Sequence, residues 1–398
     1  MTAPTTERRR SPGFTLVELL VATSILLVIL GILLSMTSTA SRIWQFGSAR
    51  VSAFQSSRAA FETMTRSISI ATLNTYYDYY GTSSVQPGQY TFRTTLNSGT
   101  NGVFTPVRYG RRSELEFVCG KNLVDSTLVP GGQITHAIFF QTPLNYTQTA
   151  DTTVSGASGY GQLTGLLNTI GFFVQFSDDS SIIPGFVKSQ PRYRYRLMEL
   201  LQPTENFEVY NVYNTNQDAL THAWFTNSIK NDATSVRLLA DNIVACVICP
   251  RLPQDPATTG TFTSSLTNDY EYDSVIANLP TGSGVTSWKL DPSNPSPQPT
   301  NMNQLPPSVR VVLVAVDETS MVHLTALSSG TPSSQQAASA MGLSGTASYS
   351  TLFQSTSNSS QLDDDLYTLT SALSGNKPPI NYRVFQTDVA IRGAKWSP

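Results

Sequence analysis

The side chains that most often perform catalysis or bind metals are few in this sequence, and they lie far apart. The histidines are His136, His222 and His323, and none lies near another or near a cysteine at the spacing of a zinc site. No G-x-S-x-G elbow, phosphate-binding loop or G-x-G-x-x-G turn follows a strand-like segment. We therefore expect no catalytic residue, no metal and no cofactor, and we interpret His136 and His323, in or beside strand-like segments, as structural.

The three cysteines could carry redox or metal chemistry only if the fold brought them together. Cys246 and Cys249 have the C-x-x-C spacing, but they lie in the strand-like segment 235–249. Residues three apart in a strand face opposite sides of a sheet, so these two could not easily form a disulfide. We interpret them and Cys119 as small buried apolar residues. A disulfide between Cys119 and one of the other two stays open as the alternative.

Carboxylates that are far apart in the sequence could also lie close together in the folded protein, as the paired acids of a glycosidase do. The candidates are Glu114, Glu116, Glu199 and Asp317. A further acidic run at 363–365 lacks the alternating ligand spacing of a calcium loop. We expect this run in the first turn of a short leucine-faced helix, where the helix dipole favours negative charge.

One acidic residue lies in an apolar segment, where a charged side chain has a high free-energy cost. Between Phe14 and Met36 the only charged residue is Glu18, in an apolar run of about 23 residues that is long enough to span a membrane. An isolated carboxylate in hydrocarbon costs several kcal/mol. A signal anchor would fit the run, and so would a removable signal peptide cut after Ala40, but neither explains Glu18.

The residues around this acid resemble the prepilin signal of type IV pilins and type II secretion pseudopilins. That signal has a basic leader, a glycine, a phenylalanine, and a glutamate at the fifth position after the glycine. The corresponding residues here are Arg8, Arg9 and Arg10, then Gly13, Phe14 and Glu18. The resemblance implies that a prepilin peptidase cuts between Gly13 and Phe14 and methylates the new amino group of Phe14.

A role for Glu18 follows from this resemblance. In a filament of stacked subunits, the carboxylate of one subunit can meet the Phe14 amine of a neighbour. Opposite charges attract far more strongly in a low dielectric than in water, and a paired acid is tolerated where a bare one is not. Glu18 would thus disfavour the lone subunit in lipid and favour the assembled one.

Beyond the membrane segment, apolar residues continue at helical spacing. The stripe consists of Val51, Phe54, Phe61, Met64, Ile68 and Ala71. No proline interrupts the chain from 14 to 71, so we predict one helix over this range. Its first part would cross the membrane and its second part would pack against a head domain.

The remainder of the chain favours an α+β fold, with a long N-terminal pilin helix packed on an antiparallel β-sheet head. Strand-like segments are 114–119, 136–141, 171–177, 192–200, 207–213, 235–249, 308–318 and 382–392.

The predicted domains are the leader 1–13, the transmembrane half-helix 14–36, the amphipathic half-helix 37–74 and the head 75–398. We expect low-complexity loops at 279–307 and 328–361, which are rich in Pro, Gly and Ser. Tyr76, Tyr77, Tyr79 and Tyr80 are interpreted as packing residues, although they could also stack on a sugar or on another subunit.

Several head segments are similar to the J-type minor pseudopilin of type II secretion, and the last two are closer still to the prepilin-like Verru_Chthon cassette protein C family. They read "SELEFVCG", "RYRYRLMELL", "VRLLADNIVACVICPRL", "LPPSVRVVLVAVDE" and "YRVFQTDVAIRGAKWS". The resemblance implies a non-enzymatic minor subunit near the tip of a type II secretion or type IV pilus-like filament. The implied partners are the prepilin peptidase, other minor and major pilin-like subunits, the inner membrane and its assembly platform.

The charge composition bears on the cellular location of the protein and on its alternative functions. The 25 Lys+Arg against 27 Asp+Glu argue against a nucleic-acid binder, and charged residues are only 13 % of the chain, which suits an exported protein. The basic leader places the N-terminus in the cytoplasm and the head in the periplasm, by the positive-inside rule. Three alternatives stay open: a minor pilin with an adhesive head, an exported enzyme that uses a prepilin signal as its anchor, and a simple signal-anchored surface protein.

Overall fold

The fold is that of a computed structural model, in which two compact units are distinguished, Met1–Ser52 and Ala53–Pro398. It describes residues 15–83, 86–92, 103–148, 165–180, 183, 186, 191–210, 222–232, 234–253, 266–268, 270–275, 302–326, 331–354, 361–377 and 379–395. The leader 1–13 and Phe14 lie outside the described residues, as does most of the predicted loop 279–307.

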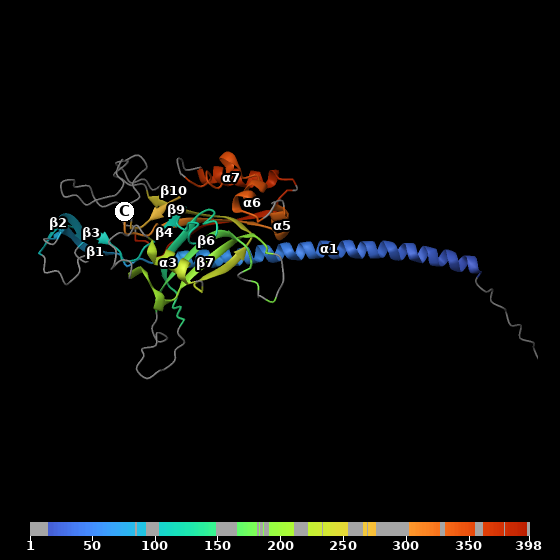
Figure 1. The fold of residues 1–398 in the computed structure, drawn as a ribbon, viewed down its shortest axis with the longest axis horizontal. Coiled ribbons are helices and arrows are strands. Elements are labelled where there is room, and N and C mark those ends of the chain that lie inside the picture. The colour runs from blue at the N-terminus through green and yellow to red at the C-terminus, as the bar shows by residue number, and fades with distance from the viewer. Residues whose placement is uncertain are drawn as a thin grey trace, which may run out of the picture. The chain divides into compact units, whose positions relative to one another are not determined.

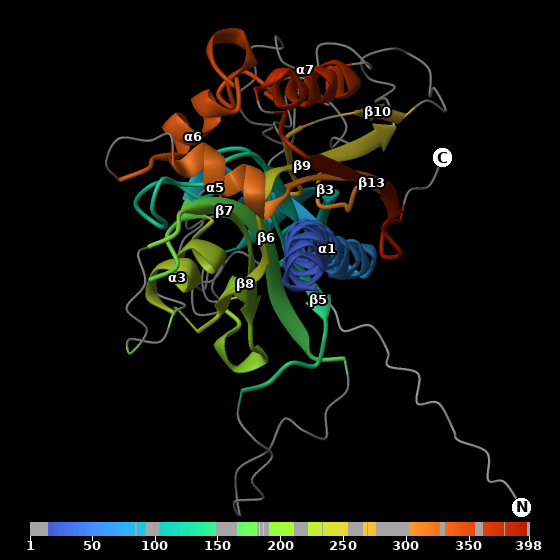
Figure 2. The same ribbon diagram turned by 90° about the vertical axis from the view of Figure 1, so that its right-hand side faces the viewer.

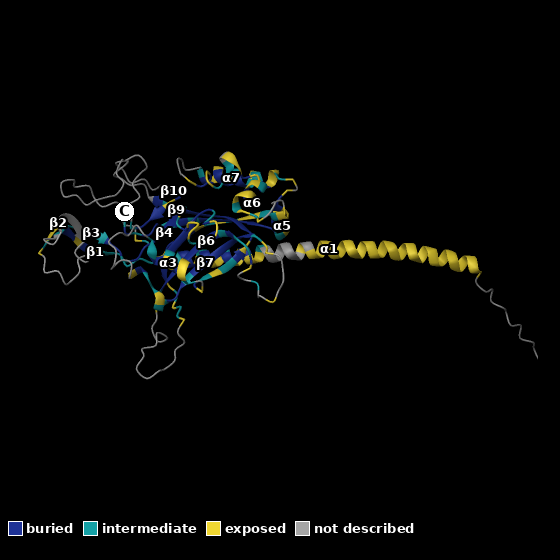
Figure 3. Cartoon of the chain, in the orientation of Figure 1, coloured by how far each residue is buried: buried dark blue, intermediate teal, exposed yellow. Residues whose placement is uncertain are grey.

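Helix α1 (Leu16–Ser69) lies where the sequence predicts a helix over 14–71 (Figure 1). Within the first unit, the most apolar 18-residue window of Leu16–Gln45 has a mean hydropathy of 2.8, and none of this span is buried. Its apolar side chains are exposed on every side of the helix, as Figure 3 shows by colour. A helix that is apolar all round needs either a protein core or a lipid bilayer around it, and this segment is long enough to cross a bilayer.

In the second unit, the last turns of α1 pack by the predicted apolar stripe. Met64 and Ile68 are fully buried in the main core, and Phe54 and Phe61 are partly buried against it. The side chain of Val51 lies outside the described residues. The helix end is closed by the far end of the sequence, because the Arg392 N–H donates to the Ser69 carbonyl at 3.0 Å. From Phe54 onward the described side chains of the predicted stripe thus pack into the head core, whereas residues 37–45, which the sequence assigns to the amphipathic half-helix, are exposed.

The largest sheet has six antiparallel strands in the order β11-β4-β5-β6-β7-β8. Their bounds are β4 (Val118–Gly120), β5 (Ala137–Pro143), β6 (Leu167–Ser177), β7 (Arg194–Gln202), β8 (Val236–Asp241) and β11 (Tyr272–Asp273). Because side chains alternate along a strand, Ile138 and Phe140 face the main core while Ala137 and Phe139 face a second core. Both faces of this sheet are thus covered.

Helix α3 (Ala223–Asn231) covers the second face through Trp224, Phe225 and Ile229. The Phe225 ring stacks on Phe139 with centroids 3.9 Å apart. Phe139 in turn lies flat across β6 at Gly171, where an added Cβ would come within 2.1 Å of the Phe139 ring. Glycine at this position is what allows the aromatic layer under α3 to form.

The other face packs against a second antiparallel sheet, in the order β10-β9-β12-β13. Its strands are β9 (Ile243–Pro253), β10 (Leu266–Asn268), β12 (Ser308–Val316) and β13 (Tyr382–Ala390). Helices α5 (Glu318–Ala326), α6 (Ser334–Ala340) and α7 (Gln361–Gly375) lie on this side of the head, opposite α3 (Figure 2). In and just beyond β13, Val389 and Ile391 are buried while Gln386, Asp388 and Arg392 are exposed, so this strand has one face in the core and one face in solvent.

A third, smaller sheet has the order β2-β1-β3, with β1 (Tyr76–Ser83), β2 (Gln86–Phe92) and β3 (Phe104–Arg112). The tyrosines of β1 divide between its faces. Tyr80 is buried and Tyr77 is 70 % exposed. The Tyr79 ring packs on Tyr109 at 4.5 Å, with a 2.7 Å hydrogen bond between the hydroxyls. The packing interpretation therefore holds for Tyr79 and Tyr80, while Tyr77 is a surface residue.

Several predicted strands are wrong in extent, and side-chain hydrogen bonds explain two of the differences. In 114–119 only the last two residues join a strand, because side chains satisfy the preceding amides: Asn74 Oδ1 accepts from the Glu114 N–H and Gln141 Oε1 from the Glu116 N–H, both at 2.9 Å. The segment 308–318 ends its strand at Val316, because Asp317 Oδ1 accepts the Ser320 N–H at 3.1 Å and starts α5.

Backbone geometry explains the other differences. Asn242 has φ 61°, a left-handed conformation that asparagine tolerates, and it divides 235–249 into β8 and β9 in separate sheets. In the predicted strand 207–213, residues 207–210 form no strand, because the Phe207 N–H closes a 3₁₀ turn (Thr204–Asn206) on the Thr204 carbonyl, and residues 211–213 lie outside the described residues. The Ser-rich stretch 328–361 is not a plain loop either. It contains α6, which begins with a capping box between Ser333 and Gln336.

Candidate functional site

The first candidate site is the start of α1, where Glu18 and Thr15 form a reciprocal pair of hydrogen bonds. The Glu18 carboxylate accepts from the Thr15 N–H at 3.0 Å and from the Thr15 hydroxyl at 2.9 Å. The Thr15 hydroxyl in turn accepts from the Glu18 N–H at 3.3 Å. This is a capping box, in which the first and fourth residues of a T-x-x-E sequence satisfy each other's backbone amides.

A local sequence signal for this contact exists, and it is separate from the prepilin signal that drew attention to Glu18. T-x-x-E before an apolar run is a sequence signature of a helix start, and here the two signals overlap. Glu18 therefore has hydrogen-bond partners within its own helix, in addition to the partner that we expect in a neighbouring subunit. The other predicted processing residues, Arg8, Arg9, Arg10, Gly13 and Phe14, lie outside the described residues.

The polar side chains that follow in the apolar span are also satisfied locally. Hydroxyls bond to carbonyls three or four residues earlier: Thr23 to Leu20, Ser24 to Val21, Thr37 to Leu33, and Ser38 and Thr39 to Ser35. Such bonds let hydroxyl groups lie in a bilayer without unsatisfied donors. The composition of Leu16–Gln45 is thus compatible with a membrane span, although Glu18 lies within it.

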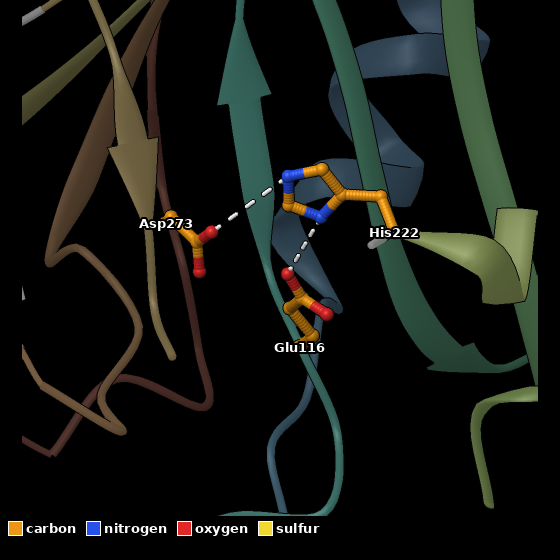
Figure 4. A group of neighbouring side chains, drawn as sticks. All are labelled: Glu116, His222 and Asp273. Carbon is orange, nitrogen blue, oxygen red and sulfur yellow. Dashed lines mark hydrogen bonds and ion pairs between the residues drawn. The ribbon is translucent and has the colours of Figure 1, made fainter. Parts of the chain in front are cut away.

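The second candidate site lies in the head, where Glu116, His222 and Asp273 come together from distant parts of the sequence (Figure 4). Glu116 precedes β4, Asp273 lies in β11 beside it, and His222 is the residue before α3. His222 Nδ1 is 3.1 Å from Glu116 Oε1, and Nε2 is 3.9 Å from Asp273 Oδ2. We call these three residues the head cluster.

Glu116 is the most firmly held member of the head cluster. Its Oε2 accepts the Trp224 indole N–H at 2.6 Å, and its own N–H donates to Gln141 Oε1 at 2.9 Å. Its side chain is only 6 % exposed. The Asp273 side chain is 11 % exposed, and its Oδ1 accepts the Val275 N–H at 2.8 Å. Both carboxylates are thus largely removed from water and held in place by donors.

His222 is held between these carboxylates by an uncommon backbone conformation. Its φ of 44° is left-handed, and its carbonyl accepts the Phe225 N–H in the first turn of α3. Burial disfavours the imidazolium, but the hydrogen bond to Glu116 and the charges of Glu116 and Asp273 outweigh it and raise the pKa of His222. The cluster therefore favours a cation between its two acids.

Sequence spacing gives no sign of the head cluster. Glu116 reads as an isolated acid and His222 as a histidine without a partner, because local spacing does not report contacts between segments this far apart. Of the other acids, Glu199 pairs with Arg237 at 3.0 Å, Glu114 accepts from the Asn74 amide at 3.2 Å, and Asp317 starts α5. The structure thus gives these three acids separate local roles.

The other candidate residues are the two remaining histidines and the three cysteines, and their surroundings favour structural roles. His136 is fully buried; its Nε2–H donates to the Phe353 carbonyl at 2.9 Å and its Nδ1 accepts the Ile248 N–H at 3.1 Å. His323 lies on the exposed side of α5, not in or beside a strand. Cys119, Cys246 and Cys249 are buried and unbridged in this structure, in agreement with their interpretation as small buried apolar residues.

The acidic run of α7 also has an internal role. Asp365 is buried and accepts from the Tyr270 hydroxyl and the Phe353 N–H, both at 3.0 Å. Asp363 and Asp364 lie in the first turn of the helix, as predicted. The predicted leucine face is buried and consists of Leu362, Leu366, Leu369 and Leu373.

Comparison with known proteins identifies the N-terminal segment. Residues 8–34 match the family model described as the prokaryotic N-terminal methylation motif. No curated protein and no solved structure matches the chain. The matched residues include the basic leader, the predicted cleavage position and Glu18, and they continue into a helix that fits a single membrane span. The motif indicates that this chain is a type IV pilin-like protein that is processed as a prepilin.

Proposed function

We propose that this protein is a minor pilin-like subunit, a pseudopilin, that assembles near the tip of a type II secretion or type IV pilus-like filament. The observation that supports this most directly is the methylation motif at 8–34, followed by an apolar helix whose last turns pack into an α+β head. Cleavage after Gly13 and methylation of Phe14 are the processing steps. The subunit has no enzymatic role in this proposal, and its partners are the peptidase, other subunits, the inner membrane and the assembly platform.

Glu18 is the residue through which assembly would be driven. In the isolated subunit its carboxylate is satisfied by Thr15, at the N-terminus of its own helix. In a filament the same carboxylate would also face the cationic amine of a neighbour, and in a low dielectric the attraction between the two charges would add to the hydrogen bonds from Thr15. The capping box keeps the acid tolerable before assembly, and the ion pair favours the assembled state.

The test has two parts, and the first is the N-terminus of the protein purified from its native membranes. We expect an intact mass and a terminal residue that correspond to N-methylated Phe14. A chain that retains its arginine leader, or that begins at Ser41, would contradict the prepilin route.

The second part separates the charge of Glu18 from its capping role. Glu18→Gln keeps an oxygen that can cap the helix and removes the charge, whereas Glu18→Ala removes both. We expect both variants to be cleaved normally and both to lose co-purification with partner subunits. Normal co-purification of Glu18→Gln would mean that capping, not the ion pair, is the function of this acid.

One observation favours a second candidate, a minor pilin whose head binds a surface or a glycan. Tyr77 is 70 % exposed, Tyr109 is 61 % exposed, and the Tyr79 and Tyr109 rings contact each other at a tilt of 38° between strands β1 and β3. Exposed aromatic rings can stack on sugars or on another protein. Replacing Tyr77 and Tyr109 by serine would reduce surface attachment in this candidate, and it would leave filament assembly unchanged.

A further inference from the structure

The head cluster is the feature of the described structure that the proposed function does not use. It brings one imidazole and two carboxylates together from three segments, and one potential ligand atom from each residue lies within 4.8 Å of the others. Imidazole and carboxylate are the ligands of zinc and related divalent metals. An ordinary ion pair would need only one of the two acids.

The two nitrogens of His222 are in different situations. Nδ1 lies 3.1 Å from Glu116 Oε1, a hydrogen-bonding distance, and the other oxygen of Glu116 is fixed by the Trp224 indole. This is the arrangement of a carboxylate that orients a metal-binding histidine from behind, placing the N–H on Nδ1 and the lone pair on Nε2. That lone pair then points toward Asp273 (Figure 4).

The distance between Nε2 and Asp273 Oδ2 fits two ligands better than it fits one hydrogen bond. The separation is 3.9 Å, which is too long for a hydrogen bond. Two zinc bonds of about 2.0–2.2 Å at a tetrahedral angle put their ligand atoms roughly 3.3–3.5 Å apart. A shift of about half an ångström, in side chains at a helix start and in a two-residue strand, would close the difference.

Charge and access also suit a cation. Both groups whose charges act on His222 are carboxylates, and their side chains are 6 % and 11 % exposed. A divalent cation carries two positive charges, where a protonated imidazole carries one, so it suits a site that presents two carboxylates. The His222 side chain is 20 % exposed, so solvent reaches the cluster at this residue.

We infer that the head binds a divalent transition metal of the zinc class, with His222 Nε2 and the Asp273 carboxylate as ligands, Glu116 as the orienting residue and water completing the coordination. The metal would tie the start of α3 to β11 and to the segment before β4. Hard cations such as Ca²⁺ and Mg²⁺ prefer all-oxygen sites, so we expect them to bind far more weakly. This inference does not depend on the proposed function of the chain.

The test uses the full chain in detergent, with Zn²⁺ and Co²⁺ as probes. We expect one saturable equivalent by calorimetry, visible Co²⁺ absorption bands that Zn²⁺ displaces, and a rise in unfolding temperature with Zn²⁺ concentration. His222→Gln and Asp273→Asn should each abolish saturable binding. Glu116→Gln, which keeps an acceptor for Nδ1–H, should weaken it roughly 10–100-fold.

The matched control is His323→Ala, since His323 is exposed on α5 and could bind metal adventitiously. Binding that survives His222→Gln, or that disappears in His323→Ala, would overturn the assignment. So would a wild-type chain that shows no saturable binding at millimolar Zn²⁺. If the His222 and Asp273 variants do not fold, a zinc anomalous map of the wild type decides, because a peak away from Nε2 and Asp273 would also overturn it.

Discussion

Glu18 and Glu116 are both surrounded by apolar sequence, but their carboxylates are satisfied in different ways. Glu18 is exposed, and its hydrogen-bond partner Thr15 is three residues away. Glu116 is buried, and it is bonded to Trp224 and His222, more than a hundred positions along the chain. The first site is complete as soon as one helical turn forms, whereas the second exists only when three segments of the head have folded together. A motif search finds the first kind of site, and only a structure finds the second.

The largest expected effect concerns the N-terminal segment, which contains the site formed by residues close together in sequence. Gly13→Asp places a charged side chain at the cleavage position, so we expect leader removal to stop completely. Intact-mass measurement of the membrane protein checks this, and an unchanged mature mass would contradict it. The fold of the head should not change, because the first residue of the described head core is Phe54. An unaltered urea midpoint of the head is the control.

The next effect contrasts the two glutamates directly. Glu116→Ala leaves the Trp224 indole and His222 without their buried carboxylate, and breaking a buried charged pair typically costs about 3–5 kcal/mol. Glu18→Ala removes a helix cap worth about 1 kcal/mol, and it does so outside the head core. Urea unfolding of the full chain in detergent, followed by circular dichroism of the β-sheet signal, measures both. Equal shifts of the head midpoint would remove the distinction between the two sites.

A third prediction concerns pH and the head alone. Burial lowers the pKa of His136 to about 4 from an ordinary value of 6.5. The unfolded chain therefore binds a proton below pH 6.5 that the folded head does not bind until about pH 4, so stability is lost as the pH falls through that window. The expected loss between pH 7 and pH 5 is about 2 kcal/mol.

His136→Gln isolates this effect, since it removes the titrating group. The difference in urea midpoint between pH 7 and pH 5 should be smaller in the variant than in the wild type. Because the raised pKa of His222 acts with the opposite sign, the comparison of wild type with variant is the informative quantity. An identical pH dependence in both proteins would show that His136 is not the source.

The smallest effect is expected at Asp388, whose partners are distant in sequence but whose side chain is 41 % exposed. It binds Arg310 at 2.8 Å and Arg251 at 3.2 Å, and the hydrogen bond from Arg310 lowers its pKa. Exposed ion pairs contribute less than about 1 kcal/mol, so Asp388→Asn should barely shift the head midpoint. A loss as large as that of Glu116→Ala would mean that long-range pairing, not burial, determines the cost.

The parts of the molecule that follow a short repeat or a local motif could be predicted from the sequence. The apolar stripe from Phe54 to Ile68 in α1 and the leucine face of α7 each depend on residues a few positions apart, and both are confirmed. The strand ends at Asn242 and Asp317 were missed although turn and capping residues stand there, because the apolar pattern on either side is nearly continuous.

The head cluster could not be predicted in the same way. Its members become neighbours only through the pairing of β11 with β4 and the packing of α3 on the sheet. Neither His222 nor Asp273 has a local sequence feature that identifies its partner. The amides of Glu114 and Glu116 were assigned to a strand for a related reason, since their acceptors, Asn74 and Gln141, lie elsewhere in the sequence.

The hydrogen bond from Arg392 to Ser69 has a consequence for the order of events during biosynthesis. The last turn of α1 leaves the ribosome early, and the segment that closes it leaves near the end of translation. At about 5–20 residues per second, tens of seconds separate the two. Throughout that interval Met64 and Ile68 have no completed core to enter, so the nascent head is vulnerable to aggregation unless a chaperone or the membrane surface shields it.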